Sequence, residues 1–170
     1  DKINKGEEGY SVMPLLLPAL AAALILVTGR AVTLQRTIAL TTLFALAVIS
    51  GAMIIIADVH GIQTVQMGGW EAPIGITLVA DRLSTIMVFV SSIVLFAVMW
   101  YGISQGLRDG DEDDPVAVFL PVYMLLCMGV NLSFLAGDLF NLYVGFEVFL
   151  VASYVLPTLG ASPGRERARI

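Results

Sequence analysis

The segment LFNLYVGFEVFLVASYVLPTL, residues Leu139–Leu159, decides the fold class of this chain. It holds 21 residues, and Glu147 is the only charged one. A helix needs about 20 consecutive, mostly apolar residues to cross a bilayer. Four further stretches of similar length carry no charge: Val12–Thr28, Ile38–Ala57, Leu83–Ile103 and Val116–Ala136. The sequence therefore predicts an all-α, polytopic membrane protein with about five transmembrane helices.

The composition gives the same result. Of the 170 residues 58% are hydrophobic and 14% are charged, and the mean hydropathy is +0.88. A soluble domain is about 45–50% apolar and about 25% charged, and a chain this short cannot bury such an excess in one core. We therefore expect a lipid bilayer as the surroundings. The net charge of −5 argues against nucleic acid as a partner.

The chain has one cysteine, Cys127, and one histidine, His60. These counts exclude an internal disulfide framework and any cysteine-based or multi-histidine metal or haem site within the chain. We expect no cofactor and no bound metal.

The apolar stretches divide the chain into three parts. Residues 1–11 are predicted to form a polar N-terminal tail, and residues 12–159 a five-helix transmembrane region. Residues 160–170 form a basic end. The longest loop, residues 59–82, contains glycines and a proline and predicts a short hairpin or an interfacial segment. Only Gly137 and Asp138 join the last two helices, which must then be antiparallel neighbours.

The distribution of lysine and arginine predicts the orientation, because these residues are in excess in cytoplasmic loops. Six of them fall on one side and three on the other. The N-terminus and the loop at 59–82 are therefore expected outside, and the C-terminus in the cytoplasm. The six are Arg30, Arg36, Arg108, Arg165, Arg167 and Arg169; the three are Lys2, Lys5 and Arg82.

Glu147 is the main candidate site residue. A charged group near the centre of a bilayer costs about 2.5–3.5 kcal/mol, and such residues usually have a function. We interpret Glu147 as a proton-carrying or ion-pairing carboxyl that meets a cation from another helix. The alternative is a neutral acid that only hydrogen-bonds a neighbouring helix. Helical spacing places Tyr143 and Tyr154 on the face of Glu147, so both are supporting candidates.

Two further supporting candidates are polar residues in or beside the last two helices. Asp138 precedes the last helix, where capping is favoured over a role in ion entry. Asn131 continues a thin polar stripe with Tyr123 and Cys127, which favours helix packing over a water-lined path. At the loop end, Asp81–Arg82 is interpreted as a local ion pair.

Two segments resemble a known family: FLAGDLFNLYVGFEVFLVASY, residues Phe134–Tyr154, and GGWEAPIGITLVADRLS, residues Gly68–Ser84. They are similar to the D-type subunit of the Mrp-type multisubunit Na+/H+ antiporters. This family is related to the antiporter-like subunits of respiratory complex I and of membrane hydrogenases. One departure is Gly145, where the D-type subunit is expected to have a bulky aromatic residue.

The resemblance implies that Glu147 is the essential glutamate of the family's fifth helix. In the family this glutamate pairs with a lysine on a later helix, which has no counterpart here. Family members have about fourteen helices around an inverted repeat and are roughly three times as long. The chain is thus expected to be the N-terminal portion of that fold, with residues 160–170 leading to a missing sixth helix.

The resemblance also implies the function: antiport of Na+ against protons through Glu147, by a secondary transporter subunit rather than an enzyme. The partners would be other membrane subunits of the complex, and the location the plasma membrane. One alternative is a redox-driven, proton-pumping subunit of complex I or of a membrane hydrogenase. A second alternative is a structural subunit that does not transport.

Overall fold

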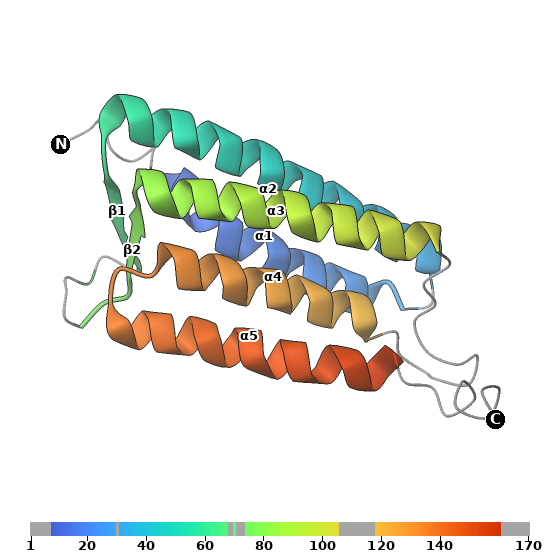
Figure 1. The fold of residues 1–170 in the computed structure, drawn as a ribbon. Coiled ribbons are helices and arrows are strands. Elements are labelled where there is room, and N and C mark those ends of the chain that lie inside the picture. The colour runs from blue at the N-terminus through green and yellow to red at the C-terminus, as the bar shows by residue number, and fades with distance from the viewer. Residues whose placement is uncertain (1–7, 30, 68–69, 71–73, 106–117, 161–170) are drawn as a thin grey trace.

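Five helices and one two-stranded sheet form the computed structural model, which describes residues 8–29, 31–67, 70, 74–105 and 118–160 (Figure 1). The prediction of a polytopic membrane fold is confirmed. Within the described residues, four helices are long and apolar enough to cross a membrane, and α4 is a shorter apolar helix of 17 residues. The elements are α1 (Glu8–Val27), α2 (Val32–His60), β1 (Gln63–Gln66), β2 (Thr77–Ala80), α3 (Arg82–Ser104), α4 (Phe119–Leu135) and α5 (Leu139–Gly160).

The ends of two helices differ clearly from the apolar stretches. Helix α1 begins at Glu8, inside the predicted polar tail. Helix α2 begins six residues before Ile38, because Gln35 folds back on the preceding turn. Its Nε2 donates to the carbonyl oxygens of Gly29 at 2.6 Å and Ile25 at 3.3 Å. Polar residues at a helix end therefore extend the helix beyond its apolar part.

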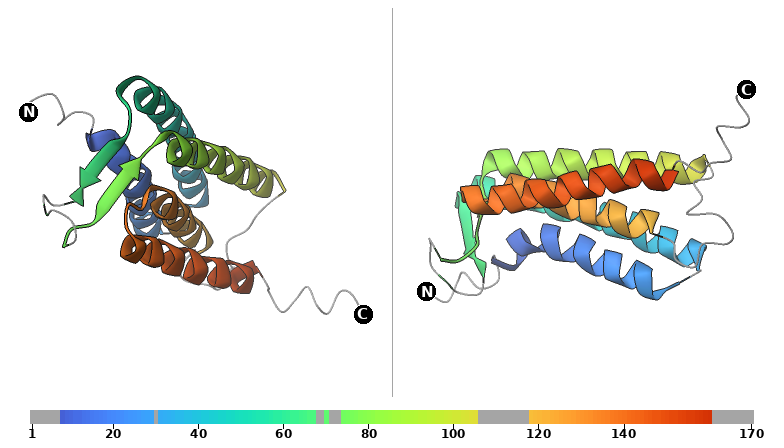
Figure 2. Two further views of the ribbon diagram at one scale, coloured as in Figure 1. Left: turned by 60° about the vertical axis from the view of Figure 1, so that its left-hand side comes forward. Right: turned by 90° about the horizontal axis from the view of Figure 1, so that it is seen from below.

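The helices run in alternating directions and lie side by side (Figures 1 and 2). Helix α1 packs against α2 and α4, α2 packs against α3, and α5 packs mainly against α4. Helix α5 is therefore an outer helix. The sheet, the start of α1 and the turn between α4 and α5 lie at one end of the bundle, which we call the hairpin end. The predicted basic end, from residue 161 onward, lies outside the described residues.

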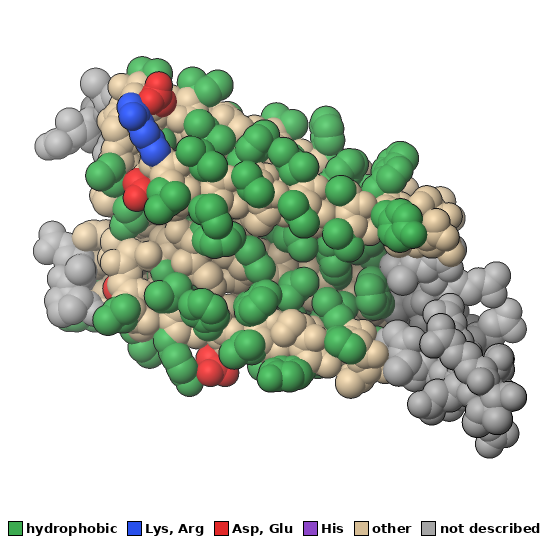
Figure 3. All heavy atoms as spheres, in the orientation of Figure 1, with side chains coloured by type: hydrophobic (Ala, Val, Ile, Leu, Met, Phe, Trp, Pro, Cys, Tyr) green, Lys and Arg blue, Asp and Glu red, His purple; other side chains and the backbone are tan. Residues whose placement is uncertain are grey.

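Two apolar clusters hold the bundle together. The larger one contains residues of α1, α2, α3 and α4 and includes Ile25, Leu43 and Met124, all fully buried. The smaller one lies at the hairpin end and includes Leu78 and Leu135. Hydrophobic side chains also cover the outer surface along the helices (Figure 3). Such a surface is compatible with lipid and not with water.

The loop between α2 and α3 forms an antiparallel hairpin, in which Gln63 lies opposite Ala80 and Gln66 opposite Thr77. The interpretation of Asp81–Arg82 as a local pair is wrong. Arg82 pairs with Asp58 of α2 at 2.5 Å, because α2 ends where α3 begins. Asp81 instead accepts a hydrogen bond from the Ser84 backbone N–H at 2.6 Å and caps α3.

Candidate functional site

Glu147 is the ninth residue of α5, which runs from Leu139 to Gly160. Its side chain lies on the exposed face of the helix. Neighbours on that face are apolar or aromatic: Val151 is 60% exposed and Phe146 is 49% exposed. In a bilayer, the carboxyl therefore lies in an apolar part of the span, on a surface that the five helices leave uncovered.

The two predicted tyrosines occupy the same exposed face. Tyr143 and Tyr154 are 62% and 74% exposed. The Tyr143 phenol lies one helical turn before Glu147 on this face. A phenol hydroxyl both donates and accepts, so it can hold a hydrogen bond to the carboxyl in either protonation state.

Asp138 lies at the N-terminus of α5. Its Oδ1 accepts a hydrogen bond of 2.7 Å from the backbone N–H of Asn141, which is the capping role that the sequence predicts. Asn141 itself is 2% exposed, and its side chain points toward β2. Its Nδ2 donates to the carbonyl oxygen of Thr77 in β2 at 3.4 Å.

The polar stripe of α4 forms contacts between helices. Asn131 is fully buried, and its Nδ2 donates to the Pro14 carbonyl oxygen of α1 at 2.9 Å. The Tyr123 hydroxyl donates to the Leu95 carbonyl oxygen of α3 at 2.8 Å. Cys127 is a buried, free thiol between them. These contacts agree with the packing interpretation of the stripe.

Helices α4 and α5 approach each other closely at two glycines. A Cβ added at Gly129 would lie 2.7 Å from the Phe149 backbone nitrogen. One added at Gly145 would lie 2.7 Å from Ser133 Oγ and 3.0 Å from its backbone nitrogen. Gly145 thus stands where the expected aromatic side chain has no room in this packing.

Sequence reasoning missed the contact between the hairpin and the start of α5. The backbone N–H of Gly137 donates to the Thr77 carbonyl oxygen at 2.9 Å, and Leu78 forms an isolated β-bridge with Ala136. The sequence predicts a short hairpin or an interfacial segment in this loop. Nothing in the pattern indicated which element the outer edge of that hairpin would meet.

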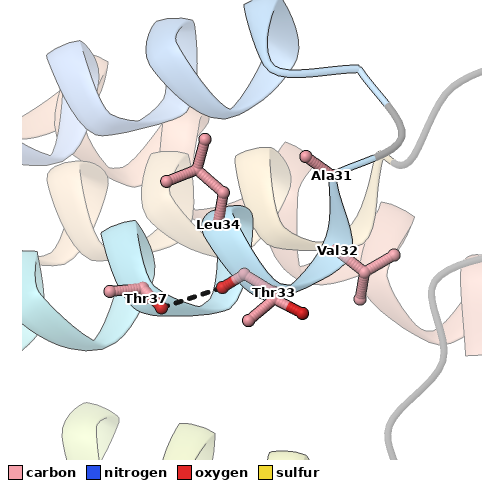
Figure 4. Close-up of a pocket in the computed structure, with 5 residues that line it drawn as sticks. All are labelled: Ala31, Val32, Thr33, Leu34 and Thr37. Carbon is pink, nitrogen blue, oxygen red and sulfur yellow. Dashed lines mark hydrogen bonds between the residues drawn. The ribbon is translucent and has the colours of Figure 1, made fainter.

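A shallow surface hollow at the start of α2 is a weaker candidate (Figure 4). Its lining residues are Ala31, Val32, Thr33, Leu34 and Thr37, and none of them is charged. The Thr37 hydroxyl donates to the Thr33 carbonyl oxygen at 2.8 Å and is thus already paired. Among the described residues, no three His, Cys, Asp or Glu side chains gather as metal ligands.

Taken together, the fold and the site define a multi-pass membrane protein with an ionisable carboxyl inside an otherwise apolar membrane helix. Such a residue marks proton or ion pathways in membrane proteins. The comparisons with known proteins then give the particular family. The predicted resemblance to the D-type subunit of the Mrp-type antiporters is confirmed.

The chain is 41% identical to the putative antiporter subunit mnhD2 of Staphylococcus epidermidis over 160 residues, which are 94% of this chain and 31% of the relative. It is 34% identical to the D subunit of the Na+/H+ antiporter of Alkalihalophilus pseudofirmus over 151 residues, 89% of this chain and 30% of the relative. The chain therefore spans about a third of the length of these relatives. No protein-family model matches it.

Solved structures show the same fold. A chain of the Mrp complex from Dietzia sp. DQ12-45-1b superposes with a TM-score of 0.77 at 24% identity, over 86% of this chain and 27% of that one. A chain of an archaeal respiratory membrane complex, the membrane-bound sulfane sulfur reductase, superposes with a TM-score of 0.70 at 20% identity. The superposition covers 87% of this chain and 30% of that one. The five helices and the hairpin thus correspond to part of a larger membrane fold.

Proposed function

We propose that this chain is a portion of the D-type subunit of a multisubunit Na+/H+ antiporter, in which Glu147 takes up and releases the transported proton. The observation that carries the proposal is the position of Glu147, a carboxyl within an apolar membrane helix. The names of both relatives support antiport, and the name of the Alkalihalophilus relative supports Na+ and protons as the exchanged ions. The substrates are then protons and Na+, and the partners are the other membrane subunits of the complex.

The chemistry follows from the surroundings of the carboxyl. In general, apolar surroundings favour the protonated form of a carboxyl group, and an approaching cation or water favours the ionised form. A change in what faces Glu147 therefore loads or releases one proton. The exposed face of α5 leaves room for such a change, and Tyr143 lies one helical turn away on the same face.

The two alternatives receive less support. A redox-driven pump agrees with the fold of the archaeal respiratory complex, but that likeness concerns the fold alone. A structural subunit without transport gives no reason for an ionisable group within an apolar membrane helix. Exchange that needs no quinone or hydrogen donor distinguishes the antiporter from the pump.

The test replaces Glu147 in the full-length subunit within its assembled complex. We expect Glu147→Gln to abolish Na+-dependent proton exchange in everted vesicles while assembly is unchanged. Ser153→Ala is the control on the same helix, because its exposed hydroxyl bonds within its own helical turn to the Leu150 carbonyl oxygen. Exchange at the wild-type rate in the Glu147→Gln complex would show that the carboxyl mechanism is wrong.

We also propose that the protein lies in the plasma membrane with the hairpin outside. Arg82 and Arg36 lie at opposite ends of the bundle; the other residues that predict the orientation lie outside the described part of the chain. In a Cys127→Ala background, Thr64→Cys in β1 should react with a membrane-impermeant maleimide on intact cells. Ser104→Cys at the end of α3 should react only after permeabilisation, and the reverse result would contradict this orientation.

A further inference from the structure

The start of α5 has a second anchor besides α4, and this anchor is the hairpin. Strand β2 pairs with β1 along one edge, and its other edge meets the turn between α4 and α5. The Thr77 carbonyl oxygen accepts from the Gly137 N–H and from Asn141 Nδ2. Leu78 is fully buried beneath this contact. We call these contacts the hairpin latch.

The fit of the hairpin latch is close. A Cβ added at Gly137 would lie 2.7 Å from Val79 Cγ2 and 2.9 Å from the Thr77 carbonyl oxygen. Asn141 is 2% exposed, and its amide donates to the partly buried Thr77 carbonyl oxygen. Losing this hydrogen bond leaves the Asn141 amide without this acceptor, which is costly for a buried group, while the Thr77 carbonyl oxygen still accepts from the Gly137 N–H.

The hairpin itself is fixed to the rest of the bundle. The ion pair between Asp58 and Arg82 joins the ends of α2 and α3 on either side of it. Leu78 and Val65 pack with Leu135 in the cluster at the hairpin end. The hairpin is therefore connected to the end of α2, the start of α3 and the start of α5.

Asn141 lies six residues before Glu147 on the same helix, which is about 9 Å along the helix axis. Helix α5 packs mainly against one helix, α4, so the hairpin latch is a second place at which its start is held. We propose that Asn141 is a positioning residue: through the hairpin latch it fixes the start of α5, and with it the depth and direction at which Glu147 lies in the bilayer. The transport part of this inference rests on the proposed function.

The experiment compares two variants that break the hairpin latch in different ways, in the full-length subunit within its complex. Asn141→Asp keeps the shape of the side chain but removes the donor to Thr77. Gly137→Ala keeps the donor and pushes β2 away. Gly9→Ala, where an added Cβ meets nothing within 4 Å, and Ser153→Ala, an exposed hydroxyl of α5, are the controls.

Two readouts are needed. The first is Na+-dependent proton exchange, which we expect to fall about tenfold in both variants at unchanged subunit levels. The second is the rate at which N,N′-dicyclohexylcarbodiimide modifies Glu147, a reaction of protonated carboxyls in apolar surroundings. We expect that rate to fall at least threefold, because a freed start of α5 lets water reach and ionise the carboxyl. Both controls should behave as wild type.

Wild-type exchange and labelling in Asn141→Asp would overturn the inference. So would a fall in exchange without a change in labelling, because the defect would then lie in assembly or elsewhere. The labelling readout does not depend on antiport. If Glu147→Gln exchanges normally while labelling still depends on the hairpin latch, the proposed function fails and the positioning stands.

Discussion

The Asn131 side chain of α4 donates a hydrogen bond of 2.9 Å to the Pro14 carbonyl oxygen of α1. In a regular helix this oxygen would accept the N–H of residue 18, but Pro18 has no N–H. Asn131 therefore supplies the donor that the proline removes. Membrane helices tolerate prolines where a neighbouring helix satisfies the freed backbone group, and this contact is such a case.

This relationship predicts a coupling between Asn131 and Pro18. Asn131→Leu should lower the free energy of unfolding by about 1 kcal/mol, within the range of interhelical hydrogen bonds in membranes. In a Pro18→Ala background the backbone N–H at position 18 is restored, so the same change should cost clearly less. Unfolding in mixed micelles measures all four proteins of the cycle. Equal costs in both backgrounds would show that the two residues are independent.

The close approach of α4 and α5 predicts a second effect on stability. Gly129→Ala places a Cβ against the Phe149 backbone, which cannot move aside without separating the helices. Overpacking of this kind costs about 1–3 kcal/mol, so the thermal midpoint in detergent should fall. Gly51→Ala is the matched control, because a Cβ added at Gly51 would lie 3.4 Å from its nearest neighbour, a ring carbon of Phe89. Similar midpoints for the two variants would contradict the close packing.

Much of the fold could be predicted from hydrophobicity alone. Apolar length locates five helices, and the ends of α3 come within one residue of the predicted ends at Leu83 and Ile103. The start of α2 could not be found in this way, because Gln35 and Arg36 are polar yet helical. Only the fold back of Gln35 on the α1–α2 turn, seen in three dimensions, accounts for the longer helix.

Part of the candidate site could likewise be predicted from the sequence, and part of it could not. Glu147 stands out because a charge within an apolar stretch is rare, and helical spacing places Tyr143 beside it. The contact between Asn141 and Thr77 joins residues 64 positions apart. The faces of these helices are apolar all round, so periodicity does not show which side of α5 meets another element. The spacing of Pro14 and Pro18, by contrast, was a readable signal that a donor must come from elsewhere.

Acidification should weaken the cap of α3 at the hairpin end. The Ser84 backbone N–H lowers the pKa of the Asp81 carboxyl below its ordinary value. A lowered folded-state pKa contributes stability above the unfolded-state pKa, and this contribution is lost as the pH falls through the folded-state pKa. Asp81→Ala should therefore cost about 1 kcal/mol near neutral pH. The difference from wild type should shrink as the pH falls below about 4.

The measurement for Asp81 is the free energy of unfolding of both proteins between neutral pH and about pH 3. Ser104→Ala is the control, because that hydroxyl bonds within its own helix turn and does not titrate in this range. A difference between wild type and Asp81→Ala that stays constant with pH would show that the carboxylate form does not stabilise the cap.

The β-bridge between Leu78 and Ala136 predicts that cysteines introduced at these two positions can form a disulfide bond. Residues that face each other across an antiparallel bridge have Cα atoms about 4.5–5.5 Å apart, which suits a disulfide bond. In a Cys127→Ala background, the Leu78→Cys and Ala136→Cys pair should cross-link on mild oxidation. The Thr64→Cys and Ala136→Cys pair should not, since β2 lies between them.

If the hairpin stays docked on α5 during transport, the cross-linked protein should retain Na+-dependent proton exchange. Loss of exchange that reduction restores would mean that the hairpin must leave the turn in each cycle.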